Sequence, residues 1–428
     1  MVIKAIDKKV AVIGGGIAGV ACAIELVNAG AEVNLVEKEH SLGGFAIRYG
    51  CKASGVCNKC SACIVNLKMN DLQMQNGIII LTGCEVIESS ENEGKFDVKI
   101  KKTPRYVSLE KCISCGLCKE VCPVNGSAIR IVHQQSLPKA YFIDEGLCLR
   151  FKGEKCNLCE KVCPAKAVNY SEKEEIFGVG ADSVVVACGF SPFDAKKRIQ
   201  YRYGVFQNVI TGINLEEQLR FKDGIRRPSD NAIPKKVAFI QCVGSRDINI
   251  GNDYCSQVCC LYAMRMAKVL KNESPEISVS IFYMDLQNLS KEASLFYEKC
   301  LKEINFVRAM PGDVGEREDK SIVINYEDIE KGEDRQEEFD LVVLSIGITP
   351  AESIKKIGKI FGLKTGESGF FQTSDPCDFT LTDKPNVFIA GACQGPKNIP
   401  ASIAQGIAAA ENVLINVKCK NPNVQNGF

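Results

Sequence analysis

Sixteen of the 23 cysteines in this 428-residue chain fall into four groups whose spacing suits metal ligands. Two groups follow or approach the pattern C-x2-C-x2-C-x3-C, and in both the last cysteine precedes a proline, Pro123 or Pro164. Thiolates with this spacing are typical of [4Fe-4S] clusters, so we predict two clusters here. The first group is Cys112, Cys115, Cys118 and Cys122, and the second is Cys148, Cys156, Cys159 and Cys163.

In proteins that hold two such clusters, the fourth cysteine of each run ligates the other cluster. We therefore expect Cys163 to complete the first ligand set and Cys122 to complete the second. The interval from Cys148 to Cys156 is wider than in the minimal motif, which leaves Cys148 the least determined ligand. Zinc is the alternative for any CxxC pair, but two complete CxxCxxxCP endings favour iron-sulfur chemistry.

A third group has the order C-x5-C-x2-C-x2-C and lies near the N-terminus. Four thiolates at this spacing can enclose another [4Fe-4S] cluster. Two alternatives stay open, which are a zinc site and a partial ligand set that Cys84 completes. The group consists of Cys51, Cys57, Cys60 and Cys63.

The fourth group has the order C-x12-C-x3-C-C and ends in two adjacent cysteines. Adjacent cysteines rarely coordinate one cluster, so the spacing alone favours a redox-active disulfide or a zinc site. For the cysteine content as a whole, metal binding is the better account, because no export signal supports a disulfide framework. The members of this group are Cys242, Cys255, Cys259 and Cys260.

The elements that must position these groups begin with a dinucleotide-binding motif. The apolar run Lys9–Ile13 predicts a buried parallel strand, which leads into the sequence GGGIAG, a helix and a second strand. Gly14 permits the tight turn, and Gly16 lets the backbone approach a pyrophosphate. Gly19 lets the helix pack on the strand, and Glu37 can accept hydrogen bonds from a ribose hydroxyl.

FAD rather than NAD is favoured by the next segment, because Glu37-Lys38 and the later Gly43-Gly44 resemble the residues after the ribose acid in flavoproteins with two dinucleotide domains. Apolar strands that run into glycine at 183–189, 341–347 and 386–392 agree with that type of protein. A helix of small residues from about 401 to 413 should lie near the flavin, although Ala392 replaces the usual aspartate. The predicted FAD-binding residues are Gly14, Gly16, Ala18, Gly19, Glu37, Lys38, Gly43, Gly44, Ala187, Gly189, Gly391, Ala392 and Ile399.

The sequence thus predicts an α/β protein, a thioredoxin-reductase-like flavoprotein with two dinucleotide domains and an inserted two-cluster ferredoxin domain. The insertion has few residues for a core of its own, so we expect its clusters to hold it together. The expected parts are residues 1–102, 173–232 and 376–428 for the FAD-binding domain, 103–172 for the insertion, and 233–375 for a second nucleotide-domain-like region.

The second nucleotide-domain-like region departs from a nicotinamide site. A strand over Val237–Ile240, a helix over Cys260–Lys271 and a strand over Ile277–Met284 that ends at Asp285 are predicted. No GxGxxG motif follows the first strand, and the sequence QCVGSR with the fourth cysteine group stands in its place. A pyrophosphate would have to bind where these cysteines lie.

Three motifs resemble the family of flavin-binding A subunits of heterodisulfide reductase, and the resemblance runs from about residue 9 to 418. They are IQCVGSR at 240–246, YCSQVCC at 254–260 and AGACQGPKNIP at 390–400. The resemblance implies that the fourth cysteine group binds an unusually ligated [4Fe-4S] cluster. The chain is similar to a short form of the family, without an extra N-terminal cluster domain or a C-terminal ferredoxin domain. It also resembles flavin subunits of quinone-interacting membrane oxidoreductase and of class II aryl-CoA reductase complexes.

Most of the cysteines outside the four groups are predicted to be small buried hydrophobic residues. Cys393 is the one to watch, because its segment is expected beside the flavin. His40 and His133 are not in a Ser/His/Asp or Cys/His arrangement, so we expect both at the surface and no imidazole-based hydrolysis. The seven remaining cysteines are Cys22, Cys84, Cys188, Cys300, Cys377, Cys393 and Cys419.

The composition is that of a globular protein, with 46% hydrophobic residues, 25% charged residues and a net charge of +1. No apolar stretch reaches eighteen residues, and the N-terminus, Met1–Lys4, lacks the regions of a signal peptide, so we expect a cytoplasmic location. Without long basic runs, neither nucleic acid nor an anionic membrane surface is expected as a partner. The expected partners are other redox subunits, which leaves peripheral membrane association only through them.

We therefore predict a FAD and [4Fe-4S] electron-transfer subunit of a multisubunit anaerobic oxidoreductase, with four clusters and no catalytic acid or nucleophile. The flavin is expected to split electron pairs, and bifurcation is a further hypothesis. One rival is a stand-alone NAD(P)H oxidoreductase that uses Asp285 as its ribose acid. Another is a structural iron-sulfur scaffold or redox sensor.

Overall fold

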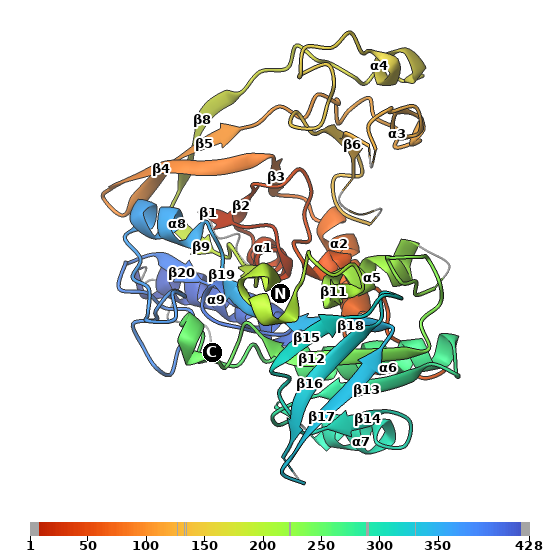
Figure 1. The fold of residues 1–428 in the computed structure, drawn as a ribbon. Coiled ribbons are helices and arrows are strands. Elements are labelled where there is room, and N and C mark those ends of the chain that lie inside the picture. Colours follow the sequence, from red (N-terminus) through yellow and green to blue (C-terminus); the bar gives the residue numbers. More distant parts are fainter. Residues whose placement is uncertain are drawn as a thin grey trace.

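The computed structural model describes residues 8–125, 127–131, 133, 135–221, 224–287, 291–329 and 331–420. A five-stranded parallel sheet lies at the centre of the first unit, in the order β20-β9-β1-β2-β3 (Figure 1). Its central strands β9 and β1 are buried over most of their length, because helices and a second sheet cover both faces. The strands are β1 (Lys9–Ile13), β2 (Glu32–Glu37), β3 (Ile78–Thr82), β9 (Ser183–Val186) and β20 (Val387–Ile389).

Helices cover one face of this sheet and an antiparallel sheet covers the other. The helices α1 and α9 pack so closely that a side chain at Gly406 would meet the Ala18 carbonyl oxygen at 2.2 Å. The first face carries α1 (Ile17–Asn28), α2 (Ala62–Gln73) and α9 (Ile399–Lys420), and the second carries β4 (Cys84–Asn92), β5 (Lys95–Lys102), β8 (Glu175–Ala181) and α8 (Ile354–Phe361).

The chain leaves the antiparallel sheet after β5 and returns to it in β8, which pairs with β5 from Phe96 opposite Ala181 to Lys102 opposite Glu175. The residues between them form the lobe at the top of Figure 1. This lobe has a small core in which several cysteines pack with Val107, Ile129 and other apolar residues. Its elements are α3 (Leu117–Glu120), β6 (Ile129–Arg130), β7 (Phe142–Ile143) and α4 (Leu158–Val162).

A buried arginine joins this lobe to the first unit. The guanidinium of Arg105 donates to the carbonyl oxygen of His40 at 2.6 Å, and also to those of Ala140 at 2.6 Å and Tyr141 at 3.0 Å. All of its acceptors are main-chain atoms, so the contact does not depend on a flexible partner side chain.

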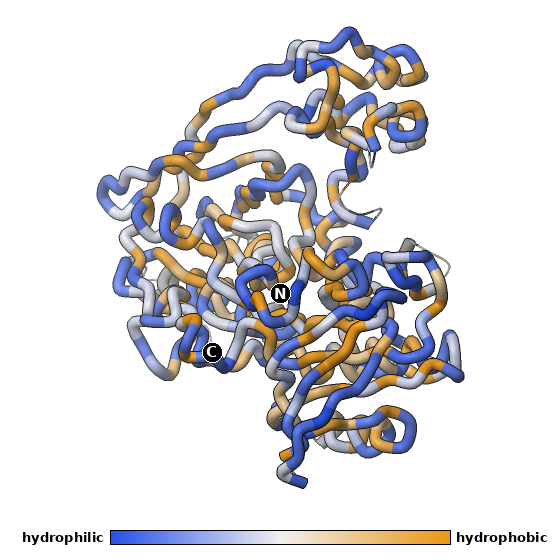
Figure 2. Tube along the Cα trace, viewed as in Figure 1, coloured by the Kyte–Doolittle hydropathy of each residue, from blue (hydrophilic) through white to orange (hydrophobic). Residues whose placement is uncertain are grey.

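The second unit contains another five-stranded parallel sheet, in the order β11-β18-β12-β13-β14. Three helices pack on one face, and a three-stranded antiparallel sheet packs on the other. Figure 2 shows the outermost strand of that smaller sheet, β17, as hydrophilic. The elements are β11 (Val209–Thr211), α5 (Gly212–Phe221), β12 (Lys236–Val243), α6 (Cys259–Glu273), β13 (Ser278–Phe282), α7 (Lys291–Cys300), β14 (Asn305–Val307), β15 (Asp313–Glu316), β16 (Ile322–Asp328), β17 (Glu333–Phe339) and β18 (Leu341–Ile346).

A short antiparallel ladder links the two units. The segment after β9 forms β10 (Phe190–Pro192), the segment after β18 forms β19 (Ile348–Pro350), and the two strands pair with each other. The carboxyl ends of both parallel sheets therefore open toward one region, where ligands bind in open α/β sheets. Five 3-10 turns complete the elements of the described residues: η1 (Ala46–Arg48), η2 (Ala195–Lys197), η3 (Ile199–Tyr201), η4 (Ile248–Ile250) and η5 (Gly391–Cys393).

Candidate functional site

The glycines of the first strand-helix turn have three different surroundings. Gly14 has φ +115°, and a side chain there would meet the Ala187 carbonyl oxygen at 2.2 Å. A side chain at Gly19 would meet the Gly14 carbonyl oxygen at 1.9 Å, whereas a Cβ atom at Gly16 would meet nothing within 4 Å. The turn is thus tightly packed at two glycines and open at the third, which leaves room for a ligand to approach the backbone.

Glu37, at the end of β2, is buried beside this turn. Its carboxylate accepts a hydrogen bond from the Gly15 backbone N–H at 2.7 Å and another from that of Glu39 at 2.8 Å. Burial raises the pKa of the Glu37 carboxyl, and the two backbone bonds oppose that rise. Each carboxylate oxygen keeps a further lone pair that a ribose hydroxyl could use.

A cavity of about 450 Å³ lies at the carboxyl ends of both sheets. Its walls contain all but one of the predicted FAD-binding residues. Gly19 is the exception, because it packs helix α1 against the turn. The predicted residues that line the cavity are Gly14, Gly16, Ala18, Glu37, Lys38, Gly43, Gly44, Ala187, Gly189, Gly391, Ala392 and Ile399.

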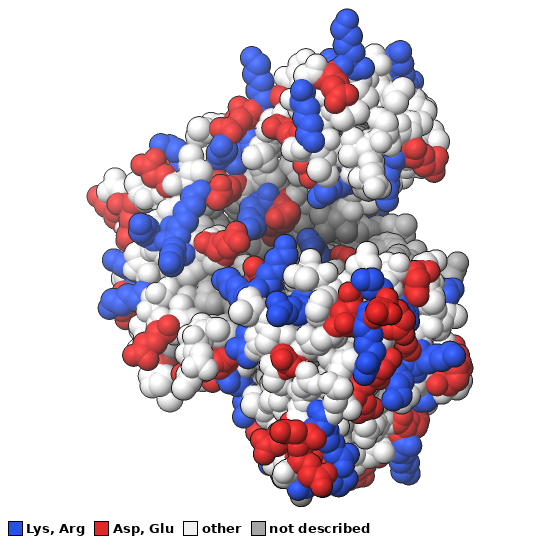
Figure 3. All heavy atoms as spheres, in the orientation of Figure 1, with Lys and Arg blue, Asp and Glu red and all other residues white. Residues whose placement is uncertain are grey.

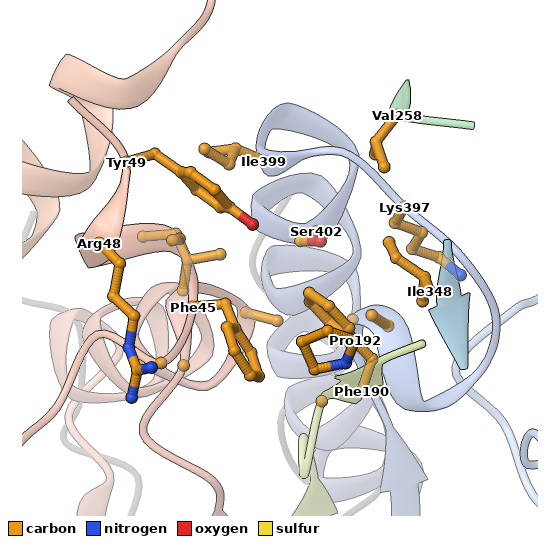
Figure 4. A pocket seen from close by; sticks show the side chains of 18 of the residues that line it. Phe45, Arg48, Tyr49, Phe190, Pro192, Val258, Ile348, Lys397, Ile399 and Ser402 are labelled. Carbon is orange, nitrogen blue, oxygen red and sulfur yellow. The ribbon is translucent and has the colours of Figure 1, made fainter. Parts of the chain in front are cut away.

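Aromatic side chains that sequence reasoning missed form much of the remaining wall. Figure 4 shows Phe45 and Phe190 facing each other from two segments, with Tyr49 pointing toward Ser402. The rings of Phe45 and Phe190 stack with their centroids 4.8 Å apart. The signal available in the sequence is the run of aromatic and basic residues directly after Gly44.

A buried ion pair holds the next segment in place. The Lys52 ammonium lies 2.7 Å from the Glu216 carboxylate, and both side chains are 4% exposed. The same carboxylate accepts hydrogen bonds from the Gly50 backbone N–H at 2.7 Å and from the Tyr262 hydroxyl at 2.8 Å. Burial, followed by the charge of Glu216, raises the pKa of Tyr262 well above its ordinary value. The residues on both sides of Cys51 are therefore fixed to α5 and α6.

Cys51 lies within this anchored segment, and the other cysteines of the third group follow it. Cys51, Cys57 and Cys63 are exposed, whereas Cys60 is half-buried and lines the cavity. Arg265 of α6 donates hydrogen bonds to the main-chain oxygens of residues 58 and 59, at 2.9 and 2.8 Å. The loop that carries these thiols thus bridges the first unit and α6 beside the cavity.

Seven of the eight cysteines of the lobe lie at its small core or at the cavity beside it. Cys122, Cys148, Cys156 and Cys159 line one cavity of about 20 Å³, which is the set expected for the second cluster. Cys112, Cys118 and Cys163 pack against the same core, and Cys115 is exposed. Backbone N–H groups donate to the sulfurs of Cys122 and Cys163, from Ala128 at 3.4 Å and Ala167 at 3.3 Å.

The fourth group surrounds the N-terminus of α6. Cys242 lies in the irregular end of β12 with φ +57°, where the pairing with β18 shifts register. The side chain of Cys259 interacts with those of Cys242, Cys255 and Cys260. Cys259 also lines the large cavity, so this group, like the third, contributes a residue to its wall.

The loop between Cys242 and Cys259 is tied to β19. The Ser256 hydroxyl accepts a hydrogen bond from the Ile348 backbone N–H at 2.9 Å, and the Tyr254 hydroxyl donates to the Ile348 oxygen at 3.2 Å. Beside it, both amide atoms of the buried Gln241 side chain and the Ser245 hydroxyl have no hydrogen-bond partner. Buried polar groups without partners are uncommon, and they lie here next to the cysteine group.

The predicted ribose acid of the second unit already has a partner. The guanidinium of Arg246 contacts the Asp285 carboxylate through both nitrogens, and one of these contacts is 3.1 Å long. This pairing lowers the pKa of Asp285. The acid at the nicotinamide position thus faces an arginine from the loop in which a pyrophosphate would bind.

Two expectations about isolated residues were wrong. Cys377 is exposed, because it lies in a turn where its backbone N–H donates to Asp375 at 2.7 Å. His40 is half-buried, its ring 4.6 Å from that of Phe142, and burial with the nearby Arg105 lowers its pKa to about 4. His133 is also half-buried, and the side chain of Cys419 lies outside the described residues.

Two findings concern the described residues as a whole. Among them, no three His, Cys, Asp or Glu side chains converge as they would around a single metal ion. No helix within the same residues is long and apolar enough to cross a membrane. Basic and acidic side chains are interspersed over the visible face of the molecule (Figure 3), in keeping with the net charge of +1.

Comparisons with known proteins agree with this geometry. An iron-sulfur A subunit of CoB--CoM heterodisulfide reductase, the second of its kind in Methanopyrus kandleri, is 39% identical over 418 residues, which cover 93% of this chain and 63% of the relative. The A subunit of H(2):CoB-CoM heterodisulfide,ferredoxin reductase from Methanothermobacter marburgensis is 36% identical over 437 residues, covering 96% of this chain and 64% of the relative. The chain thus spans a little under two thirds of the length of these relatives.

Solved structures confirm the predicted thioredoxin-reductase-like α/β fold. Thioredoxin reductase of T. acidophilum superposes with a TM-score of 0.53 at 14% identity and covers 96% of this chain and 98% of its own. That of Lactococcus lactis gives 0.52 at 14% identity, with 96% and 99% covered. The family profile described as pyridine nucleotide-disulphide oxidoreductase matches residues 8–140 and 149–406. The chain therefore belongs to the pyridine nucleotide-disulphide oxidoreductase family, and its homologues there include the A subunits of heterodisulfide reductases.

Proposed function

We propose that the chain is a FAD and [4Fe-4S] electron-transfer subunit of a multisubunit oxidoreductase of the heterodisulfide reductase type. One observation carries the proposal. Cys60 of the third group and Cys259 of the fourth group line the same cavity as the open glycine turn. Two groups of thiols that lie far apart in the sequence thus each contribute a residue to the wall of one ligand site.

The residues of the cavity fit FAD. Gly16 leaves open space where a pyrophosphate would approach the backbone, and Glu37 retains acceptor capacity for a ribose. The apolar wall around Phe45 and Phe190 suits a flat ring system. Gly391, at the turn before α9, is held by a hydrogen bond of 2.9 Å from its backbone N–H to the Gln405 side chain.

The thiols of the lobe fit iron-sulfur clusters. Cys122 lies with Cys148, Cys156 and Cys159 around one cavity, which supports the crossed ligation expected of a two-cluster ferredoxin. The backbone N–H groups that point at the sulfurs of Cys122 and Cys163 would stabilise thiolate ligands. On this basis residues 103–172 would form the two-cluster insertion, and the third and fourth groups would hold one cluster each.

When bound, FAD supplies two-electron chemistry and each cluster supplies one-electron chemistry, so their combination splits electron pairs. The protein residues bind the cofactors, orient them and shield them. The Lys52–Glu216 pair and Arg265 fix the loop of the third group against α6 at the cavity edge. Ser256 and Tyr254 fix the loop of the fourth group against β19. No side chain is required to act as an acid or a nucleophile in this role.

Quantitation of iron, acid-labile sulfide and flavin in the anaerobically purified chain tests the proposal. About sixteen irons and one FAD per chain are expected for four clusters. Cys60→Ala and Cys259→Ala should each lower the iron content by about four per chain, whereas Cys300→Ala, at a buried thiol far from the groups in sequence, should leave it unchanged. About eight irons with bound zinc would restrict the proposal to the lobe, and a chain without FAD would refute it.

Bifurcation is the finer part of the proposal. It requires that the first electron leave the reduced flavin at a higher potential than the second, so that one transfer drives the other. Potentiometric titration of the flavin in the same preparation measures both potentials. Potentials in the normal order would leave pair splitting intact and remove bifurcation.

A further inference from the structure

Two cysteines outside the four groups follow neighbouring strands of the first sheet. β9 and β20 are parallel, with Val186 opposite Ile389, and the Ala390 backbone N–H donates to the Val186 oxygen at 2.9 Å. Cys188 comes two residues after β9, and Cys393 lies in the turn η5 directly after β20. Adjacent strands lie about 4.8 Å apart, so the segments that leave them start side by side.

The two side chains meet. The side chain of each cysteine interacts with that of the other. Cys393 is fully buried, and its thiol donates hydrogen bonds to the Ala390 oxygen at 3.1 Å and the Val186 oxygen at 3.4 Å. Cys188 packs against the same apolar cluster. The fixed backbone on both sides keeps the two sulfurs together.

The pair is connected to the proposed flavin site through one member only. Cys188 lines the large cavity together with Ser353 and Lys397, whereas Cys393 lies behind the wall. The Ser353 hydroxyl interacts with Cys188, and the Lys397 ammonium interacts with Cys393. A cation beside a thiol favours its thiolate, the form that reacts with sulfur and with electron acceptors.

Another buried thiol shows the contrast. Cys300 lies in the core under the second sheet, and the groups that act on it are Lys268 and Glu303 rather than a second cysteine. It is a structural thiol of the kind that the sequence predicts. Cys188 and Cys393 differ from it in having each other and an open cavity.

We propose that Cys188 and Cys393 form a redox-active dithiol that exchanges an electron pair with the flavin of the large cavity. On oxidation two S–H bonds break and one S–S bond forms, and the two electrons and two protons convert FAD to FADH2. The reverse reaction returns both thiols. Cys188 faces the cavity and Cys393 is its buried partner. The pair therefore stores two electrons beside the flavin, whereas each of the proposed iron-sulfur clusters takes one electron. This inference rests on the proposed FAD site.

Peptide mapping of the anaerobically purified chain tests it without reliance on activity. The protein is equilibrated at a series of oxidised and reduced dithiothreitol ratios, quenched in acid, alkylated and digested, and flavin is measured in the same samples. We expect a peptide linked through Cys188 and Cys393 at oxidising ratios and two alkylated peptides at reducing ratios. Dithionite titration of Cys188→Ser and Cys393→Ser, corrected for the flavin and iron measured in each sample, should show a loss of two electron equivalents per chain in each variant.

Cys300→Ser is the matched control and should take up as many equivalents as the unaltered chain. If both thiols are alkylated at every ratio while FAD is bound, the dithiol proposal is wrong and the proposed function stands. If the purified chain contains no FAD, the proposed function fails first. The linked peptide in the unaltered chain needs no variant, so the result does not depend on how well the serine variants fold.

Discussion

Gly16 and Gly19 belong to one motif, yet a side chain at each position would meet different surroundings. Gly16 has φ −70°, a conformation open to any residue, and free space above its Cβ position. Gly19 faces the Gly14 carbonyl oxygen at a distance that no Cβ atom tolerates. One glycine therefore serves a ligand and the other serves packing.

We predict that Gly16→Val abolishes FAD retention while the free energy of unfolding changes by less than about 1 kcal/mol, because its side chain enters the cavity rather than the core. Gly19→Val is the matched control and should destabilise the chain by about 1–3 kcal/mol or more through overpacking. Flavin release on acid extraction and urea unfolding measure the two effects. Normal flavin content in Gly16→Val would show that no pyrophosphate approaches this turn.

At the scale of elements, the Lys52–Glu216 pair joins the loop around Cys51 to α5 and, through Tyr262, to α6. Both charges are almost fully buried, so removal of one leaves the other without compensation. The local arrangement of the third cysteine group depends on this anchor, because Gly50 also donates to Glu216.

Lys52→Met should lower the free energy of unfolding by about 3–5 kcal/mol, and the double variant Lys52→Met with Glu216→Gln should recover part of this loss. Denaturant unfolding of the single and double variants measures the coupling. Lys99→Met, which breaks the exposed pair with Glu88, should leave stability unchanged. Equal effects at the buried and exposed pairs would contradict the anchoring role.

Local sequence predicts much of these elements but not what joins them. Lys9–Ile13, the turn after it and the strand that ends at Glu37 are confirmed, because each depends on neighbours in the chain. The helix expected over 401–413 is longer, because its apolar face continues along α1. The partners Lys52 and Glu216 are 164 residues apart, and no local pattern links them. The meeting of Cys188 with Cys393 likewise requires the pairing of β9 with β20.

At the scale of the whole molecule, the second parallel sheet resembles that of a nicotinamide-binding domain. Cysteines lie at the carboxyl end of this sheet, where the dinucleotide would bind. Cys259 and Cys260 are the first residues of α6 and are buried, so sulfur atoms fill the helix N-terminus where a pyrophosphate would bind. Arg246 pairs with Asp285, the acid that would contact a ribose. Two features thus oppose a bound dinucleotide.

We therefore predict that NADH and NADPH do not reduce the flavin of the purified chain, whereas dithionite does. Anaerobic stopped-flow absorbance at the flavin band measures both reactions. Asp285→Asn serves as a control, because loss of its pairing with Arg246 should not create reduction by NADH if the cysteines are the main obstacle. Rapid bleaching of the flavin by NADH would restore the stand-alone oxidoreductase as the better account.

The lobe is attached through two adjacent strands of one sheet, and Arg105 at its base also donates a hydrogen bond to the His40 main-chain oxygen of the first unit. A domain on a single flexible linker must move to its partner before each electron transfer, and the time of that movement then limits the transfer rate. This lobe has no such freedom at its base, so the gap between its thiols and the central cavity stays constant. Electrons crossing the molecule would meet a barrier of fixed width, with a rate indifferent to the viscosity of the solvent.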